Sequence, residues 1–202
     1  FEDLCNHCLE TAKLASLQAL AEWDERTYLP QAAGEYRAEQ ITLLARLVHE
    51  RQTDQRIGQW LEQLSESPLA TDPHGDTGCT IRQMRREYDR LVKLPPRLVE
   101  ELTHTAVRGQ QVWDVARANN DFASFAPILE KMVKLKQEQA DALGYEACRY
   151  DALLDEYEPG ETTANVTSVL AGLRQQLVPL VAAITDSGRE APVEILRRHY
   201  PI

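Results

Sequence analysis

Apolar side chains recur at three- and four-residue steps along almost the entire chain of 202 residues. Ile41, Leu44, Ala45 and Val48 give the cleanest example, because positions i, i+3, i+4 and i+7 share one face of an α-helix. No convincing run of β-branched residues alternates apolar with polar side chains, as a half-buried strand would. The chain is therefore predicted to fold as an all-α, multi-helix protein.

Breaks in this rhythm set the expected helix boundaries. The longest break, residues 65–78, contains Pro68, Pro73 and Gly75 and is expected to be a loop. Residues 188–202 are expected to form an extended tail, and residues 1–202 as a whole are expected to form a single helical segment. Helices are predicted at about residues 3–25, 37–50, 54–64, 81–91, 95–113, 124–143, 150–157 and 163–184.

Several helix ends carry residues suited to capping. Asp54 is a predicted N-cap, and either Asp121 or Ser124 caps a later helix, because their side-chain oxygens accept from free backbone N–H groups. Gly144 is a predicted C-cap, since glycine tolerates a positive φ. Pro179 is expected to bend the last long helix or to shift its boundary.

Inward-facing stripes are also predicted on other helices. In the first helix the stripe comprises Leu14, Leu17, Leu20 and Ala21, and Trp113 marks a buried stripe further along. The stripe of the last long helix comprises Val166, Val169, Leu170, Leu173, Leu177, Val181 and Ile184.

Charge and hydropathy limit the partners of the chain. Its 22 basic and 32 acidic side chains give a formal net charge of −10, which repels phosphate backbones, so no nucleic-acid partner is expected. No window approaches the roughly 20 apolar residues that cross a bilayer, so we expect no membrane partner and a soluble, cytoplasmic protein. The four cysteines are too sparse for a disulfide scaffold and suit a reducing compartment.

A zinc peptidase helix needs two histidines one turn apart and a glutamate beside the first. No two of the five histidines lie four residues apart. His49-Glu50 begins such a motif, but Thr53 stands where the second imidazole is needed. We interpret His49 as a partly exposed residue near a helix C-terminus, where a cation suits the dipole. No catalytic, cofactor-binding or metal-binding residue is therefore assigned in this chain.

Two shorter patterns contain residue types that bind metals. Cys5-Asn6-His7-Cys8 includes one Cys-x-x-Cys pair, but a structural zinc site takes about four ligands, and Cys79 and Cys148 are isolated. Glu101 and His104 match half of a helical di-iron motif, which needs a second copy and two further glutamates. We favour apolar packing for the first pattern and chance for the second.

Trp23, Asp24, Arg26 and Thr27 form the one candidate groove lining. Trp23 and Thr27 share a helix face at i, i+4, so an aromatic plate, a hydroxyl and flanking charges are placed to line a peptide groove. The alternative is that Trp23 is a core residue and that Asp24 pairs with Arg26 or with a neighbouring helix. We favour this structural alternative.

Three segments, in the same order, resemble the Taq-type metallocarboxypeptidases, the thermostable carboxypeptidase Taq-like family. Two of them are Leu14–Pro30, in which Leu29 stands where the family often has Met, and Arg37–Glu50. The third is Tyr150–Gly160, which reads YDALLDEYEPG. The resemblance is to the N-terminal portion of a family member only.

The resemblance implies a zincin-like helical carboxypeptidase fold, of which this chain supplies a groove wall and lid region. Members of the family are zinc-dependent enzymes that remove single residues from peptide C-termini, and they are commonly homodimers. Their zinc ligands, catalytic glutamate and substrate-carboxylate anchors lie in the C-terminal part, so none is transferred to a residue here. The resemblance implies that this chain alone is inactive.

The main alternative is a stand-alone acidic helical module that binds a partner protein and has no enzymatic activity. A weaker alternative is a helical metal protein that uses Cys5, His7 and Cys8. The downstream reading frame separates the first two hypotheses, because a His-Glu-x-x-His motif there favours the enzyme and a stop codon favours the module.

Overall fold

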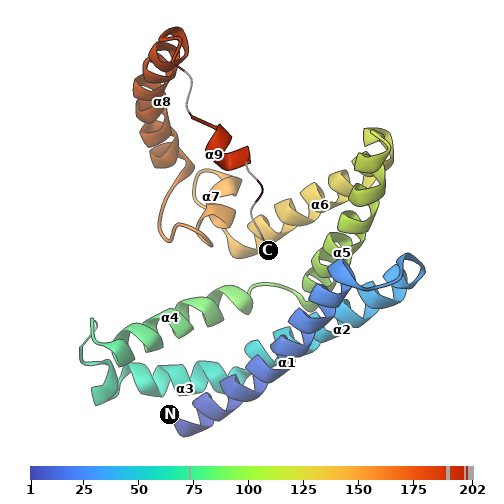
Figure 1. The fold of residues 1–202 in the computed structure, drawn as a ribbon. Helices are drawn as coiled ribbons and strands as arrows, with labels where there is room; N and C mark the ends of the chain where they lie inside the picture. Colours follow the sequence, from blue (N-terminus) through green and yellow to red (C-terminus); the bar gives the residue numbers. More distant parts are fainter. Residues whose placement is uncertain (73, 190–191, 198, 200–202) are drawn as a thin grey trace. The chain divides into compact units, whose positions relative to one another are not determined.

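All regular structure in the described part of the chain is helical, which confirms the all-α prediction (Figure 1). The computed structural model describes residues 1–72, 74–189, 192–197 and 199. The elements in chain order are α1 (Glu2–Thr27), η1 (Gln31–Ala33), α2 (Gly34–Gln52), α3 (Gln55–Ser65), η2 (Pro68–Ala70), α4 (Asp76–Leu91), α5 (Pro96–Ala118), α6 (Phe122–Leu143), α7 (Arg149–Leu154), α8 (Thr163–Asp186) and α9 (Glu194–Arg197).

The chain divides into two compact units, Phe1–Ala152 and Leu153–Ile202, where a single segment was expected. In the first unit α2 packs against both α1 and α5, α5 packs against α6, and α3 packs against α4. The second unit contains α8, a continuous helix in which Pro179 lies in the interior and not at a boundary.

The predicted caps are present at the helix ends. Asp54 accepts a hydrogen bond from the backbone N–H of Arg56 at 2.9 Å, and Asp121 accepts from that of Ser124 at 3.2 Å. These carboxylates satisfy N–H groups that have no partner inside the helix. Gly144 ends α6 with φ = 86°, a conformation that glycine adopts without steric cost.

The predicted stripe of α3 is buried, and so is most of that of α2. Ile41, Ala45 and Val48 are buried, whereas Leu44 is half-buried. The main hydrophobic cluster is built where α1, α3 and α4 meet, and it excludes water from one face of each helix. Its buried members are Leu4, Ile57, Leu61, Leu64 and Ile81, with Cys8, Trp60, Ala70, Met84 and Tyr88 packed against them.

The predicted stripe of α1 is only partly buried. Leu14 and Ala21 are half-buried, as is the neighbouring Gln18. Leu17 and Leu20 are 57% and 59% exposed, so their predicted burial was wrong. Trp113 is exposed as well. Periodicity identifies an apolar face, but only a partner helix buries it.

The predicted loop and tail contain more regular structure than expected. Within residues 65–78, Pro68–Ala70 forms η2, and α4 already begins at Asp76. Within residues 188–202, Glu194–Arg197 forms α9. Pro73, residues 190–191, residue 198 and residues 200–202 lie outside the described residues, so the extended tail is not tested there.

One helix in the described part of the chain, α8, is long and apolar enough to cross a bilayer by length and composition alone. The expectation that no window approaches this length was therefore wrong. The expectation of no membrane partner remains a prediction, because soluble core helices also meet this criterion.

Removing the α3 cap is expected to weaken the first unit. Hydrogen bonds from the Arg56 side chain and backbone hold the pKa of Asp54 at about 2, below its ordinary 3.8. Asp54→Ala is therefore expected to lower the free energy of unfolding by about 1 kcal/mol. Because the folded-state pKa is depressed, the contribution of the charge is present above pH 3.8 and is lost as the pH falls through about 2.

Urea denaturation of the wild type and of Asp54→Ala at pH 7 and at pH 2.5 measures this effect. Asp54→Asn is the matched control, because it keeps an acceptor for the Arg56 N–H but has no carboxylate to titrate. The difference in the free energy of unfolding between the wild type and Asp54→Asn should be smaller at pH 2.5 than at pH 7. An equal difference at both pH values would show that the Asp54 charge does not stabilise the first unit.

Candidate functional site

An open groove of about 630 Å³ runs between α1 and α2 in the first unit. It contains Trp23 and Asp24 of the predicted set, whereas Arg26 and Thr27 are not among its lining residues. The Thr27 hydroxyl donates instead to the Trp23 carbonyl at 2.8 Å. The groove is lined by Leu17, Leu20, Ala21, Trp23, Asp24, Arg37, Gln40, Leu43 and Leu44.

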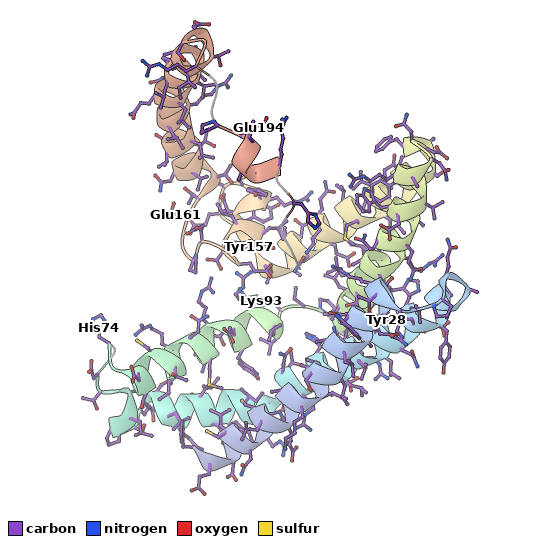
Figure 2. All side chains as sticks on the ribbon, viewed as in Figure 1. Tyr28, His74, Lys93, Tyr157, Glu161 and Glu194 are labelled. Atoms are coloured by element: carbon purple, nitrogen blue, oxygen red, sulfur yellow. The ribbon has the colours of Figure 1, made fainter. Side chains whose placement is uncertain are left out.

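The polar end of this groove is an interhelical clamp. Arg37 on α2 donates to Asp24 Oδ2 at 2.6 Å and to the Ala21 carbonyl on α1 at 3.0 Å. Asp24 therefore pairs with a neighbouring helix, as the structural alternative proposed. Trp23 is not a core residue, because it is 53% exposed and its ring lies 5.4 Å from that of Tyr28, which is labelled in Figure 2. The groove combines exposed aromatic surface with a fixed ion pair.

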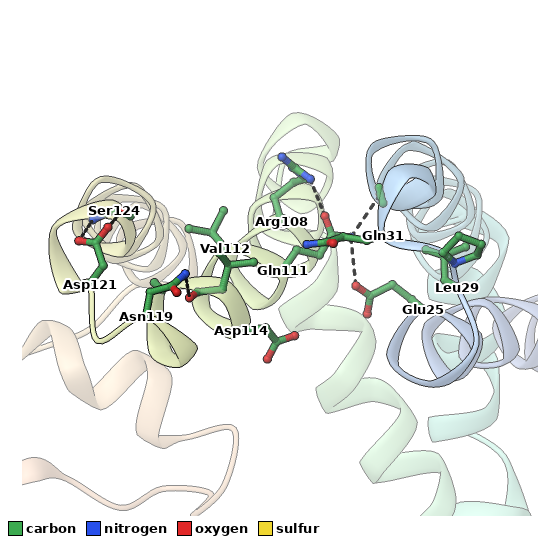
Figure 3. Close-up of a pocket in the computed structure, with 14 residues that line it drawn as sticks. Glu25, Leu29, Gln31, Arg108, Gln111, Val112, Asp114, Asn119, Asp121 and Ser124 are labelled. Atoms are coloured by element: carbon green, nitrogen blue, oxygen red, sulfur yellow. Dashed lines mark hydrogen bonds between the residues drawn. The ribbon is translucent and has the colours of Figure 1, made fainter.

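A second hollow of about 560 Å³ lies between the α1–α2 turn, α5 and the start of α6 (Figure 3). Gln111 is at its centre. The Gln111 amide donates to Glu25 Oε1 at 3.0 Å and to the Gly34 carbonyl at 3.3 Å, and its own oxygen accepts from Arg108. Arg108 also pairs with Glu35 at 2.9 Å. This network joins α1, α2 and α5.

Sequence reasoning missed the Gln111 network because its partners are distant in the chain. Gly34 lies 77 residues before Gln111, and Glu25 lies 86 residues before it. The missed signal is Gly34 itself, which is buried at the start of α2. A Cβ atom built there would lie 2.7 Å from Gln111 Oε1, so the Gln111 amide would have to move from its present position.

Gly34→Ala is therefore expected to displace the Gln111 amide and to lower the free energy of unfolding by about 1 kcal/mol, by loss of hydrogen bonds. Combining it with Gln111→Ala removes the clash, so the double variant should lose less than the sum of the two single losses. Thermal and urea unfolding of the four proteins measure the coupling. Strict additivity would show that the contact does not constrain position 34.

Two buried histidines, His7 and His49, serve as interhelical anchors. His49 is buried, which corrects the expectation of partial exposure, and its Nε2 donates to the Leu94 carbonyl at 3.0 Å. His7 is also buried, and its Nε2 donates to the Arg51 carbonyl at 2.7 Å. The Arg51 carbonyl lies in the last turn of α2, where helix carbonyls have no intrahelical partner, and the Leu94 carbonyl lies in the connection between α4 and α5.

The residues around Cys5 are Cys8 and the buried His7. The pKa of the Cys8 thiol is raised, first by burial and second by the neighbouring Cys5. Nowhere among the described residues do three His, Cys, Asp or Glu side chains gather in a metal-binding group. No chemical step is therefore assigned to a metal held by the described residues.

Glu101 and His104 are directed to separate partners. Glu101 pairs with Arg97, which also pairs with Glu138 on α6. His104 Nε2 lies 3.3 Å from Glu35 Oε1 on α2. Glu101 and His104, the two residues of the half di-iron motif, therefore take part in ion pairs with different partners and do not converge on one point.

The acidic end of Tyr150–Gly160 closes a turn. Asp155 Oδ1 accepts the backbone N–H of Gly160 at 2.9 Å, and Gly160 has φ = 82°. A short carboxylate and a residue that tolerates positive φ are both required for this geometry. Tyr157, between them, is 79% exposed and labelled in Figure 2.

The fold is shared by solved helical carboxypeptidases. BsuCP superposes with a TM-score of 0.88 at 27% identity, over 99% of this chain and 40% of that one. The M32 carboxypeptidase of Deinococcus radiodurans gives 0.74 at 32% identity, over 94% of this chain and 38% of that one. These similarities place the chain in the class of all-helical metallocarboxypeptidase folds.

The chain belongs to the Carboxypeptidase Taq (M32) metallopeptidase family, whose model matches residues 3–202. Thermostable carboxypeptidase 1 of Thermus thermophilus is 39% identical over all of this chain and 41% of its own length. Carboxypeptidase 1 of Bacillus subtilis is 30% identical over 91% of this chain and 36% of its own length. The chain thus spans about two-fifths of the length of these relatives, and the resemblance seen in the sequence is confirmed.

Proposed function

We propose that this chain is the N-terminal portion of a metallocarboxypeptidase that removes C-terminal residues from peptides. The single observation that carries the proposal is the family match over residues 3–202 in a chain that spans 41% of a carboxypeptidase relative. In this proposal the α1–α2 groove contributes exposed aromatic and apolar surface beside the Asp24–Arg37 pair, and the hydrolytic centre lies in the remaining polypeptide.

The proposal assigns the metal, which we expect to be zinc, to residues outside this chain. A zinc ion that activates water needs about three protein ligands and an open position. The described residues offer no such convergent group. The imidazoles of His7 and His49 are each hydrogen-bonded to a backbone carbonyl through Nε2. We also propose a homodimeric assembly, as the family resemblance implies, and a cytoplasmic location, which the sparse cysteines suit.

A peptidase assay on two proteins tests the proposal. The protein encoded by the complete reading frame that contains this chain should release the C-terminal amino acid from an N-blocked peptide. A chelator should abolish this release, and added zinc should restore it. Residues 1–202 alone should release none.

Each part of the proposal has its own contrary outcome. Release by residues 1–202 would contradict the division of labour between the two parts. No release by the complete protein with any divalent metal would contradict the carboxypeptidase, and would leave the acidic interaction module as the better account.

A further inference from the structure

Cys5 and Cys8 lie one helical turn apart near the start of α1, and both are half-buried free thiols. In an α-helix the Cα atoms of residues three apart are about 5 Å from each other, within the range of about 4.4 to 6.8 Å that a disulfide spans. The Cα–Cβ bonds of a helix tilt toward its N-terminus, which directs Cys8 toward the turn that contains Cys5. The backbone of α1 therefore places the two cysteines at a separation that a disulfide accepts.

The surroundings of Cys8 distinguish it from its neighbour. Its side chain packs against the hydrophobic cluster that contains Leu4 and Leu61. Burial raises the pKa of the Cys8 thiol, and the nearby Cys5 raises this pKa further. The thiolate is the nucleophile of thiol–disulfide exchange, so Cys8 is disfavoured as the first thiol to react. We therefore expect Cys5 to react first and Cys8 to react second.

An open hollow of about 210 Å³ adjoins Cys8 between α1, α3 and α4. Met84 and Tyr88 of α4 are among its other lining residues. Close packing resists the movement of a core side chain, but a side chain that borders a hollow has room to change rotamer. Cys8 therefore has room to turn toward Cys5 without displacing the cluster.

A bond between the two cysteines strains the turn of α1 that they enclose. Cβ atoms three residues apart on a helix are about 5 to 6 Å from each other, whereas a disulfide needs about 3.5 to 4.5 Å. The turn contains His7, whose Nε2 bonds to the Arg51 carbonyl at 2.7 Å, and it directly follows Leu4, which is 1% exposed. Drawing Cys5 and Cys8 together therefore pulls on two side chains that attach α1 to its neighbours.

We propose that Cys5 and Cys8 are a redox modification site, at which a low-molecular-weight disulfide such as oxidised glutathione forms a reversible intrahelical disulfide that loosens the start of α1. The Cys5 thiolate attacks one sulfur of the small disulfide, which gives a mixed disulfide and releases one small thiol. The Cys8 thiolate then attacks Cys5 Sγ and releases the second small thiol. The two cysteines lose two electrons and two protons, and the small disulfide gains them.

The strain makes this disulfide a reversible one. Strained disulfides are more easily reduced than structural ones, and in reducing compartments they are transient and often redox-sensing. None of these steps involves the proposed peptidase activity, so failure of the one leaves the other intact.

Peptide mass spectrometry tests the site in the folded wild-type protein encoded by the complete reading frame. Lys13 is the first tryptic site after Phe1, so one peptide contains both Cys5 and Cys8. After incubation with oxidised glutathione and alkylation, at least about half of this peptide should carry no alkyl group and weigh two hydrogen atoms less than the dithiol. Excess reduced glutathione should restore both thiols. Two alkylated cysteines, or a persistent glutathione adduct on Cys5, would overturn the proposal.

Single substitutions test the order of attack. In Cys8→Ser the reaction should stop at a glutathione adduct on Cys5, because the second thiol is missing. In Cys5→Ser the adduct on Cys8 should form at least about tenfold more slowly than the adduct on Cys5 forms in Cys8→Ser. Cys148, a half-buried thiol without a second cysteine one turn away, is the internal control and should carry at most an adduct. Equal rates in the two variants would overturn the assigned order.

Thermal unfolding tests the loosening of α1. Oxidation should lower the Tm of the wild type by about 4 °C, because the strain of the closed turn exceeds the entropic gain from a short loop. Cys5→Ser treated in the same way forms no disulfide but keeps the other reactive thiols, so its Tm should change by no more than about 1 °C. An oxidised wild type that is as stable as the reduced protein would overturn the proposed effect on α1.

Discussion

Leu61→Ala is expected to lower the free energy of unfolding of residues 1–202 by about 3 kcal/mol, because it removes buried methyl groups and leaves a cavity. Leu61 is 0% exposed at the centre of the cluster that joins α1, α3 and α4. For a chain of this size the corresponding fall in Tm is about 6 to 12 °C.

Trp60 provides the optical signal for this experiment in a background in which Trp23 and Trp113 are replaced by Phe. Its side chain packs against the same cluster, so its fluorescence should follow the loss of the cluster during urea unfolding. Gln63→Ala, two residues away on the exposed side of α3, is the matched control and should shift stability by no more than about 0.5 kcal/mol. A loss below 1 kcal/mol for Leu61→Ala, relative to an expected range of about 2 to 5 kcal/mol, would show that the cluster is not the cooperative core.

His49→Leu is expected to cost about 2 kcal/mol, although leucine is apolar and similar in size. The His49 ring donates to the Leu94 carbonyl at 3.0 Å from a buried position. Leucine would leave that carbonyl without its partner, and an unpaired buried acceptor costs about 1 to 3 kcal/mol. Urea unfolding of the variant measures this loss.

His49→Gln separates the hydrogen bond from the packing. Its side-chain amide supplies a donor, so it should recover part of the stability lost in His49→Leu. If the leucine variant is as stable as the wild type, the hydrogen bond does not hold α2 to the segment before α5. His49 also begins the incomplete His-Glu zinc motif, and in the structure its ring anchors α2 to the segment before α5.

The local features of the chain were predictable because their causes lie within a few residues. The Asp54 cap depends on a backbone N–H two residues away, and the buried stripe of α2 depends on positions i to i+7. Gly144 was likewise identified from glycine's tolerance of positive φ. The family followed from three short segments, and the model match over residues 3–202 confirmed it.

The candidate site was less predictable, because its geometry depends on the relative rotation of the helices. Of the proposed groove lining, Trp23 and Asp24 line the α1–α2 groove, and Arg26 and Thr27 do not. Asp24 was assigned correctly to a neighbouring helix, but Arg37 was not named as its partner. Whether the groove contacts peptide remains a prediction.

The amino-acid sequence by itself determined that the chain is helical, that Asp54 caps its helix, and which family the chain belongs to. Only the tertiary structure decided that His49 is buried, that Leu17 and Leu20 are exposed, and that Gln111 reaches Gly34. Helix formation and capping are set by hydrogen bonds between near neighbours, whereas burial requires a partner surface supplied by residues far along the chain.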